Sequence, residues 1–351
     1  MKDLVTDANF PRTLDQRVYH LGIRAGEVAN RIITVGSPSR AERIAGFLDA
    51  SPAPFRLATE RGFLTITGRY QGTPLSIVSI GMGNAMADFF VREVRECLSG
   101  DMVVVRLGSC GGLVDIKVGS VVVPRASIAV NRNYDFDFQT GQSTEAPYRY
   151  SKPVQADDEL RAAVAKTLRD TRPPTVAAGV ITDTINASTD SFYSSQGRQT
   201  SFPDCNSGVI KDLQGLHKDL ATFEMETFQI LHLAASWPTD SHAHASEAAA
   251  PPVSGRPATP AVSGTQASAP QSPPADVHAA SKDGVPLSPR PRIRAAAAHI
   301  VFAARDSREF ITPAEVEQIE DWAGRGVLEA LAHFAIAPER LHADEGSVWE
   351  Q

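Results

Sequence analysis

The sequence has little of what secreted, membrane or nucleic-acid-binding proteins need. It has only three cysteines, Cys97, Cys110 and Cys205, and their spacing fits neither a disulfide framework nor a zinc site. No apolar run approaches the roughly 20 residues of a membrane helix, and residues 1–17 form a polar arm without the apolar core of a secretory signal. The formal net charge of -7 argues against an extended nucleic-acid surface. We therefore expect a cytoplasmic protein in a reducing compartment, with no membrane and no nucleic acid among its partners.

The rest of the composition is typical of a globular protein, with 42% hydrophobic and 21% charged residues in 351. We expect a single domain over residues 18–335 and a C-terminal tail over residues 336–351. Residues 238–290 interrupt this domain, because they are rich in Ala, Pro, Ser and Gly and show no periodic apolar pattern. Such a segment cannot bury enough surface to offset the entropy lost on ordering. The sequence therefore predicts a disordered insertion that the chemistry does not need.

Apolar runs bounded by glycine turns predict strands, and amphipathic segments predict helices. The run at 102–107 contains consecutive valines, which is typical of a central strand buried on both faces. The predicted strands are Arg31–Val35, Phe63–Thr67, Leu75–Ile80, Met102–Leu107, Val118–Pro124, Thr175–Ile181 and a last strand around Ile300–Phe302. The predicted helices are Ala41–Leu48, Ala85–Leu98, Asp157–Arg169, Thr222–Ala235 and Pro313–Phe334.

Glycine turns follow several of these strands and lie beside arginine or serine side chains. The turn from Gly36 to Arg40 joins a strand to a helix, which is an arrangement that suits phosphate. An ordinary turn with Ser39 as the helix N-cap explains the same residues. Arg106 ends a buried strand and Ser109 follows it in a glycine-rich turn, so the two side chains can clamp an anion. The alternative for Arg106 is a buried ion pair.

The stretch 188–198 combines many hydroxyl groups with aromatic rings, one amide and one guanidinium. Gln196 and Arg198 can present donors and one acceptor to the edge of a flat heterocycle. Phe192 can stack on the face of such a ring. The alternative is a solvated loop rich in serine, with its aromatic rings packed locally.

Two carboxylates and a further glycine turn bear on which kind of binding site the chain can form. Glu224 and Glu226 are two residues apart on a predicted helix, so only one of them can face a given pocket. Both carboxylates can instead simply favour the N-terminus of the helix. The glycine turn that starts at Gly81 lacks the complete Gly-x-Gly-x-x-Gly pattern, so we do not expect a dinucleotide site.

Taken together, these stretches resemble the nucleoside phosphorylase family of the uridine phosphorylase type. The resemblance covers about residues 18–236 and 293–335. It implies an α/β fold with a central mixed β-sheet flanked by helices on both faces. The stretches that carry it are Gly36-Ser-Pro-Ser-Arg40, Ile80-Gly-Met-Gly83, Arg106-Leu-Gly-Ser-Cys-Gly-Gly112, Ser191-Phe-Tyr-Ser-Ser-Gln-Gly-Arg198 and Glu224-Met-Glu226.

The resemblance implies phosphorolysis of uridine to uracil and ribose 1-phosphate, in nucleoside salvage or catabolism. Arg106, Glu226 and Arg198 are the implied catalytic residues, with inorganic phosphate as co-substrate and neither cofactor nor metal. Arg61 and His20 resemble residues that reach the site from a neighbouring subunit, which implies a homo-oligomer, a dimer or a trimer of dimers, with shared active sites. The implied binding residues are Gly36, Arg40, Arg61, Arg106 and Ser109 for phosphate, His20, Met225 and Glu226 for ribose, and Phe192, Gln196, Arg198 and Arg305 for the base.

The sequence departs from the family at points that bear on substrate choice. Gly62 stands where some bacterial relatives carry a cation-binding glutamate, so we do not predict that monovalent-ion site. Asp306 follows Arg305, and purine-specific relatives use an aspartate near this position. Asp306 leaves a purine nucleoside phosphorylase as one alternative. Two others are a nucleoside hydrolase that uses water and, outside the enzymes, a nucleoside-binding sensor domain. The pair of Gln196 and Arg198 favours a pyrimidine.

Overall fold

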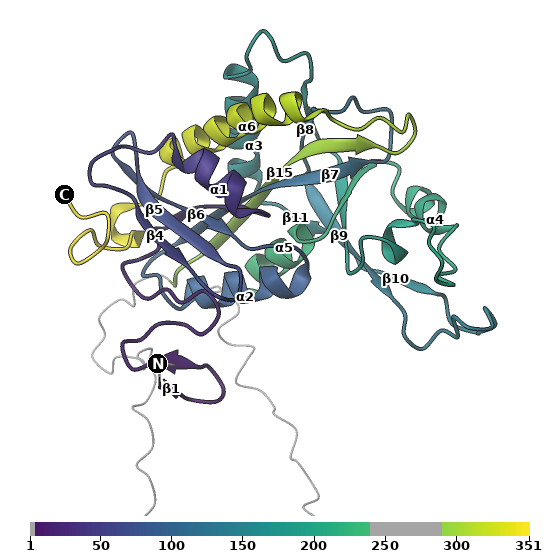
Figure 1. Cartoon of the computed structure of the whole chain (residues 1–351), viewed down its shortest axis with the longest axis horizontal. Helices are drawn as coiled ribbons and strands as arrows, with labels where there is room; N and C mark the ends of the chain where they lie inside the picture. The colour runs from purple at the N-terminus through teal and green to yellow at the C-terminus, as the bar shows by residue number, and fades with distance from the viewer. Residues whose placement is uncertain (1–3, 239–289) are drawn as a thin grey trace, which may run out of the picture. The chain divides into compact units, whose positions relative to one another are not determined.

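The computed structural model describes residues 4–238 and 290–351 (Figure 1). The insertion predicted at 238–290 falls almost wholly outside these described residues. The chain on either side of it, up to Trp237 and from Pro291 onward, forms one compact unit. Its N-terminal residues form the small hairpin of β1 (Val5–Thr6) and β2 (Arg12–Thr13).

A mixed β-sheet is the centre of this unit, as predicted. β7 (Met102–Gly112) runs parallel to β3 (Arg31–Val35) and to β15 (Ile293–Ala304), and its far end is antiparallel to β14 (Leu220–Glu224). The main order is β10-β9-β13-β14-β7-β3-β6-β5-β4. The remaining strands are β4 (Phe55–Ala58), β5 (Leu64–Tyr70), β6 (Thr73–Ser79), β8 (Val121–Val123), β9 (Ala126–Arg132), β10 (Tyr148–Tyr150), β11 (Val154–Gln155), β12 (Val180–Thr182) and β13 (Ile185–Thr189).

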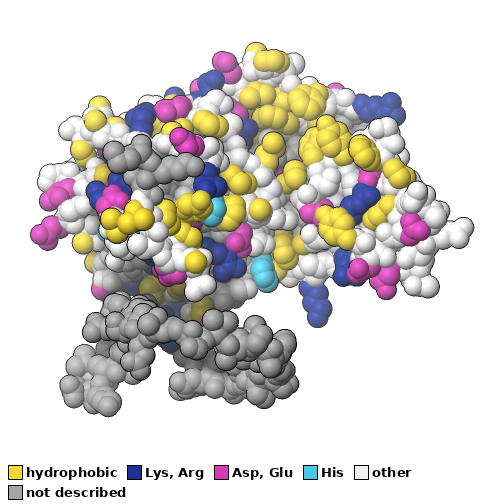
Figure 2. Space-filling model, turned by 60° about the horizontal axis from the view of Figure 1, so that its bottom comes forward, with side chains coloured by type: hydrophobic (Ala, Val, Ile, Leu, Met, Phe, Trp, Pro, Cys, Tyr) yellow, Lys and Arg dark blue, Asp and Glu magenta, His cyan; other side chains and the backbone are white. Residues whose placement is uncertain are grey.

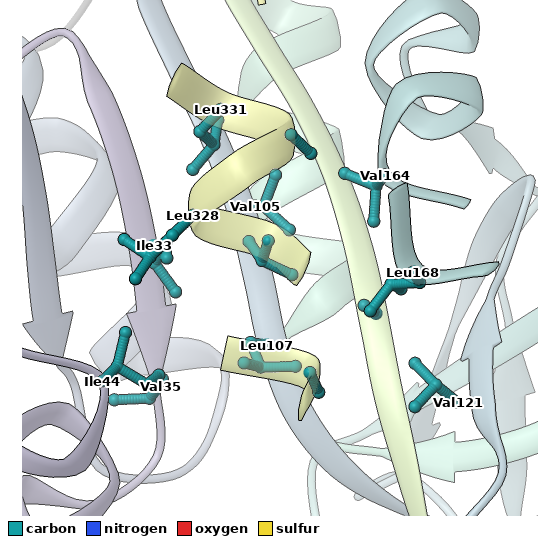
Figure 3. Close-up of a cluster of buried hydrophobic side chains, with 14 of the residues drawn as sticks. Ile33, Val35, Ile44, Val105, Leu107, Val121, Val164, Leu168, Leu328 and Leu331 are labelled. Atoms are coloured by element: carbon teal, nitrogen blue, oxygen red, sulfur yellow. The ribbon is translucent and has the colours of Figure 1, made fainter. Parts of the chain in front are cut away.

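Helices cover both faces of the sheet, because the buried strands carry apolar side chains on both sides. Val105 and Leu107 of β7 pack with α1, α3 and α6, whereas Val104 points the other way and packs with α2 and α5. Figure 3 shows the first of these clusters, in which Leu328 and Leu331 of α6 lie over the sheet. The helices are α1 (Pro38–Ala45), α2 (Asn84–Arg95), α3 (Asp158–Asp170), α4 (Val209–Leu216), α5 (Thr227–Ser236) and α6 (Pro313–His333).

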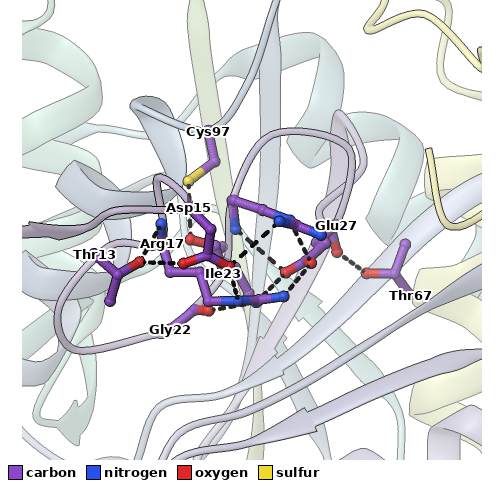
Figure 4. Close-up of polar contacts among 9 residues, drawn as sticks. Thr13, Asp15, Arg17, Gly22, Ile23, Glu27, Thr67 and Cys97 are labelled. Atoms are coloured by element: carbon purple, nitrogen blue, oxygen red, sulfur yellow. Dashed lines mark hydrogen bonds and ion pairs between the residues drawn. The ribbon is translucent and has the colours of Figure 1, made fainter. Parts of the chain in front are cut away.

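The loop before β3 is held by a polar cluster around one arginine (Figure 4). Arg17 donates to both oxygens of Glu27, at 2.6 and 2.7 Å, and to the Gly22 carbonyl at 2.7 Å. Thr67 of β5 donates to the Glu27 carbonyl at 2.8 Å, which ties the loop to the sheet. This bidentate arrangement fixes the shape of the loop that carries His20.

The C-terminal residues 336–351 also contact the compact unit. Trp349 is buried, and its carbonyl accepts from Arg69 of β5 at 2.9 Å. Arg69 also pairs with Asp344 at 2.6 Å. Asp101, just before the central strand, pairs with Arg340. The segment expected as a tail is therefore part of the compact unit and is held to Arg69 of β5 and to Asp101 before β7.

Several local predictions were wrong. The strand expected over Thr175–Ile181 is only the short strand Val180–Thr182. The stretch that carries Phe192 follows β13 instead, and the polar residues of β13 did not predict a strand. The helix expected from Thr222 is first the buried strand β14 and becomes α5 only at Thr227. The N-cap of α1 is Ser37 rather than Ser39, because Pro38 takes the first helical position.

Candidate active site

A cavity of about 420 Å³ opens where the main sheet strands end. Its lining comes from the β3–α1 turn, the β6–α2 turn, β7, the 3-10 helix Ser194–Gln196, the β14–α5 junction and the end of β15. The cavity is lined by Gly36, Ser37, Arg40, Gly81, Met82, Arg106, Ser109, Cys110, Gly111, Phe192, Gln196, Arg198, Phe223, Glu224, Met225, Glu226, Phe302, Ala303 and Phe310. Most of the residues predicted for the site therefore meet in one place.

A buried ion pair lies at the inner end of this cavity. Arg106 donates from Nη2 to Oε2 of Glu226 at 2.7 Å, and both side chains are almost fully buried. The other oxygen of Glu226 accepts the Gly83 N–H at 2.6 Å. Burial raises the pKa of Glu226, while Arg106 and the Gly83 N–H oppose that rise. Nε and Nη1 of Arg106 are buried and have no hydrogen-bond partner among the described residues, so the protein satisfies only part of this cation's hydrogen-bonding capacity.

A second arginine adds positive charge at the same end. Arg40 of α1 is buried and donates from Nε to Glu320 at 2.7 Å. Burial lowers the pKa of Arg40, Glu320 raises it, and the nearby Arg106 lowers it further. A Cβ atom at Gly36 would lie 3.5 Å from Nη2 of Arg106, so the glycine turn runs close to this guanidinium. Two arginines with one carboxylate each, beside the N-terminus of α1, favour an anion here.

The outer end of the cavity has the polar and aromatic groups predicted for a flat ring. Arg198 stacks its guanidinium 3.8 Å from the centre of the Phe192 ring and donates to the Gln196 side-chain carbonyl. Gln196 is buried, and its amide donates to Thr189 at 2.9 Å. Burial lowers the pKa of Arg198 to about 10, and the positive charge of Arg305 lowers it further.

Arg305 lies beside this group although it does not line the cavity. Its Nη1 donates to the backbone carbonyl of Gln196 at 3.1 Å. Asp306 is exposed and does not line the cavity. Of the two neighbours, it is therefore Arg305 that touches the segment carrying the predicted base-binding residues.

His20 and Arg61 do not line the cavity of their own chain. Nδ1 of His20 lies 2.6 Å from Glu93, and its ring stacks on Phe89 at 3.9 Å. Arg61 lies over the ring of Tyr19 at 4.2 Å, and Tyr19 in turn contacts His20 edge-on. The two predicted residues thus lie close together at the surface, apart from the groups that the cavity gathers, and their role stays a prediction.

Comparison with known proteins agrees with this geometry. Residues 30–237 match the Phosphorylase superfamily. The chain belongs to this superfamily. A uridine phosphorylase of Thermococcus kodakarensis is 28% identical over 67% of this chain and 78% of its own length, and that of Escherichia coli K12 is 27% identical over 62% and 80%. A solved uridine phosphorylase structure from the oomycete Phytophthora capsici is 33% identical, covers 95% of this chain and 100% of its own, and superposes with a TM-score of 0.75.

The position of Glu224 differs from the one that the sequence indicated. Glu224 ends β14, so helical spacing does not apply and both Glu224 and Glu226 line the cavity. The carboxylate of Glu224 accepts the backbone N–H groups of Glu226 and Thr227 at 2.8 and 2.9 Å, and the Asn186 amide at 2.7 Å. It therefore caps α5 and fixes the backbone that carries Glu226.

Sequence reasoning also missed most of the apolar lining of this phosphorylase-superfamily cavity. Phe223 is buried, while Phe310 is 70% exposed and Met82 is 76% exposed where they line it. Phe302 lies on β15, 5.6 Å from the Arg40 guanidinium. Hydrophobic side chains gather over much of the face shown in Figure 2. Phe302 was predicted only as part of the last strand, and exposed aromatic residues in loops have no periodic pattern that would reveal them.

The described residues show neither a helix that could span a membrane nor a cluster of metal ligands. Among residues 4–238 and 290–351, none of the helices has the length and apolar character to traverse a bilayer. Over the same ranges, no group of three or more His, Cys, Asp or Glu side chains is arranged to bind a metal ion.

Proposed function

We propose that this member of the Phosphorylase superfamily cleaves the N-glycosidic bond of uridine with inorganic phosphate, giving uracil and ribose 1-phosphate. One observation carries the proposal. A single cavity is lined both by the buried guanidinium groups of Arg40 and Arg106 and by an aromatic ring, an amide and a third guanidinium, and Glu226, which is bonded to Arg106, lines it too. The matched relatives from Thermococcus and Escherichia, and the Phytophthora structure, are uridine phosphorylases.

The cationic end suits the phosphate. Arg106 supplies a guanidinium for charge-assisted hydrogen bonds, and Arg40 adds a second one. Ser109 contributes a hydroxyl in the same wall, and Gly36 leaves room for an oxyanion beside Arg106. These groups hold the phosphate in line with the sugar carbon, which removes much of the entropic barrier to attack.

Glu226 is placed to act on the ribose. Its carboxylate is held at both oxygens, by Arg106 and by the Gly83 N–H, so it needs no reorganisation during the reaction. A fixed negative charge beside the sugar favours the positive charge that develops on the ring as the bond to the base breaks. Met225 precedes it in the lining and gives the ribose an apolar contact.

The outer end of the cavity accounts for the choice of uracil. Uracil presents two carbonyl acceptors and one N–H donor, which the amide of Gln196 and the guanidinium of Arg198 can match. Negative charge that gathers on the uracil carbonyls is stabilised by Arg198, with Arg305 behind it. Phe192 gives the base a face to stack on. The purine alternative needs a carboxylate near N7, and Asp306 lies exposed outside the lining.

The proposal extends to cofactors, cellular role and oligomeric state. The reaction requires no cofactor or metal, since the residues named above supply the charge and the donors. We propose a cytoplasmic protein that acts in pyrimidine nucleoside salvage, as a homo-oligomer in which His20 and Arg61 complete the site of a neighbouring copy. Their place beside each other outside their own cavity supports that arrangement.

The proposal is tested by assaying the purified chain against uridine, thymidine, inosine and adenosine, each with and without phosphate. We expect phosphate-dependent cleavage, with uridine preferred and the purine nucleosides poor, because a mismatched edge leaves buried groups unpaired. A Gln196→Glu variant is a matched control, since it keeps the shape and removes the amide donor. Equal cleavage without phosphate would identify a hydrolase, and a preference for inosine would reject the base assignment.

A further inference from the structure

A buried histidine that the proposed reaction does not use lies directly behind the ion pair of Arg106 and Glu226. His299 is on β15, opposite Gly108 of β7, and is fully buried. A Cβ atom at Gly108 would lie 3.4 Å from Nε of Arg106 and 3.6 Å from Cδ2 of His299. The imidazole and the guanidinium therefore share the space that this glycine leaves open.

The hydrogen bonds around Thr227 determine the tautomer of His299. Oε2 of Glu224 accepts two backbone N–H groups of α5, so it is an acceptor, and the Thr227 hydroxyl donates to it at 3.0 Å. That hydroxyl has one proton, and Nε2 of His299 lies 2.8 Å from its oxygen. Nε2 must therefore carry the proton and donate to Thr227. Nδ1 is left as a lone-pair acceptor, without a hydrogen-bond partner among the described residues.

The histidine is neutral over the whole working range of pH. Burial, together with the positive charge of Arg106, lowers its pKa to about 3, while Glu226 opposes this. A second positive charge beside Arg106 would compete for the only carboxylate that pairs with it among the described residues. A neutral N–H donor fixes Thr227 without that competition.

We propose that His299 is a positioning residue for phosphate: it donates to Thr227, the first residue of α5, and thereby holds Glu226 and, through it, Arg106. The chain of contacts is continuous, since Thr227 bonds Glu224, Glu224 fixes the backbone of Glu226, and Glu226 holds Arg106. The base-binding group around Gln196 meets this chain of contacts at a different atom, because Thr189, which accepts from Gln196, donates to the backbone carbonyl of Glu224 at 3.3 Å and not to its carboxylate. This inference rests on the proposed function for its meaning, but phosphate binding tests it independently of turnover.

A purely structural role makes a different prediction for the same substitution. His299→Leu removes both the unpaired Nδ1 acceptor and the bond to Thr227, and a purely structural role predicts unchanged phosphate binding in the folded variant. A positioning role predicts that phosphate binding weakens even though the fold is intact. His299→Gln is the matched control, because its amide can still donate towards Thr227.

The test measures phosphate and uracil affinity by calorimetry, kinetic constants with uridine, and the thermal midpoint for the wild type, His299→Leu and His299→Gln. We expect His299→Leu to weaken phosphate binding and to lower kcat/KM for phosphate by roughly 3- to 10-fold, the size of one lost hydrogen bond. Uracil affinity should not change, and His299→Gln should stay near the wild type. Unchanged phosphate affinity in His299→Leu, or an equal loss of uracil affinity, would overturn the inference.

A second pair of variants covers the case in which His299→Leu does not fold. Thr227→Val breaks the same contact from the other side, and Thr227→Ser keeps the hydroxyl. Thr227→Val should reproduce the selective loss of phosphate affinity, whereas Thr227→Ser should not, and equal behaviour of the two would reject the proposal. A wild type that binds phosphate but fails to cleave uridine would reject the proposed function and leave this comparison valid.

Discussion

Replacing Arg106 with alanine should damage phosphate use and stability for separable reasons. The variant loses charge-assisted donors to phosphate, worth about 1.5–3 kcal/mol, or roughly 10- to 150-fold in kcat/KM for phosphate. It also leaves Glu226 buried without its partner at 2.7 Å. Removing one member of a buried ion pair costs about 3–5 kcal/mol of folding free energy if the other member stays charged.

Protonation of Glu226 limits that second loss and gives it a characteristic pH dependence. Burial already raises the pKa of Glu226, and removal of Arg106 takes away the main opposing charge. The folded variant then binds a proton that the unfolded chain releases, so its unfolding free energy should fall as the pH rises through and above the ordinary range of a glutamate. Denaturant unfolding at several pH values measures this slope against the wild type.

The double variant Arg106→Ala with Glu226→Gln separates the two effects. It removes the stranded charge, so stability and its pH dependence should return towards the wild type while phosphorolysis stays impaired. Steady-state kinetics at varied phosphate concentration completes the assay. An Arg106→Ala enzyme with wild-type constants for phosphate, or a double variant that regains activity together with stability, would refute the assignment of Arg106.

Three further predictions test other parts of the account. Arg198→Ala should lower kcat as well as raise KM for uridine, because charge on the leaving base grows only towards the transition state; a change in KM alone would contradict this. Mixing inactive Arg61→Ala chains with inactive Glu226→Ala chains should restore some activity through mixed sites, whereas an active monomer in sedimentation would disprove sharing. Because burial lowers the pKa of His299 from 6.5 to about 3, the unfolded chain binds a proton there that the folded chain does not, so the unfolding free energy should fall as the pH drops below about 6.5. His299→Leu should flatten that slope, measured by denaturant unfolding, and an identical slope in both proteins would show that His299 is not the group responsible.

The sequence predicted the elements whose pattern is local and strong. β3 agrees with the prediction at both ends, as its burial on both faces makes its apolar run continuous. α6 was predicted to within one residue, since its N-terminus carries a capping box from Thr312 to Glu315 and its apolar side chains recur at helical spacing. The glycine turn before Arg40 was also placed correctly. The glycine-rich turn expected after Arg106 was wrong, because β7 continues through Ser109 to Gly112, although Arg106 and Ser109 both line the cavity.

The parts that failed depend on tertiary contacts that no local pattern records. β13 and β14 carry Asn186, Ser188, Thr222 and Glu224, which look unsuitable for buried strands. Their polar groups satisfy one another, with Asn186 bonded to Glu224 and Thr222 bonded to Asn186. Burial of such residues costs little when the network is complete. His299 was not predicted as a site residue, because only the folded chain brings it close to Arg106.

In the proposed reaction, phosphate rather than water displaces uracil from the ribose of uridine, in the cavity that holds Arg106 and Glu226. The most direct measurement is phosphorus NMR of a reaction mixture in which uracil release is followed at the same time. We expect one ribose 1-phosphate formed for each uracil released, and formation of both slowed by roughly 10- to 150-fold with Arg106→Ala. Uracil released together with free ribose, without a new phosphate ester, would contradict it.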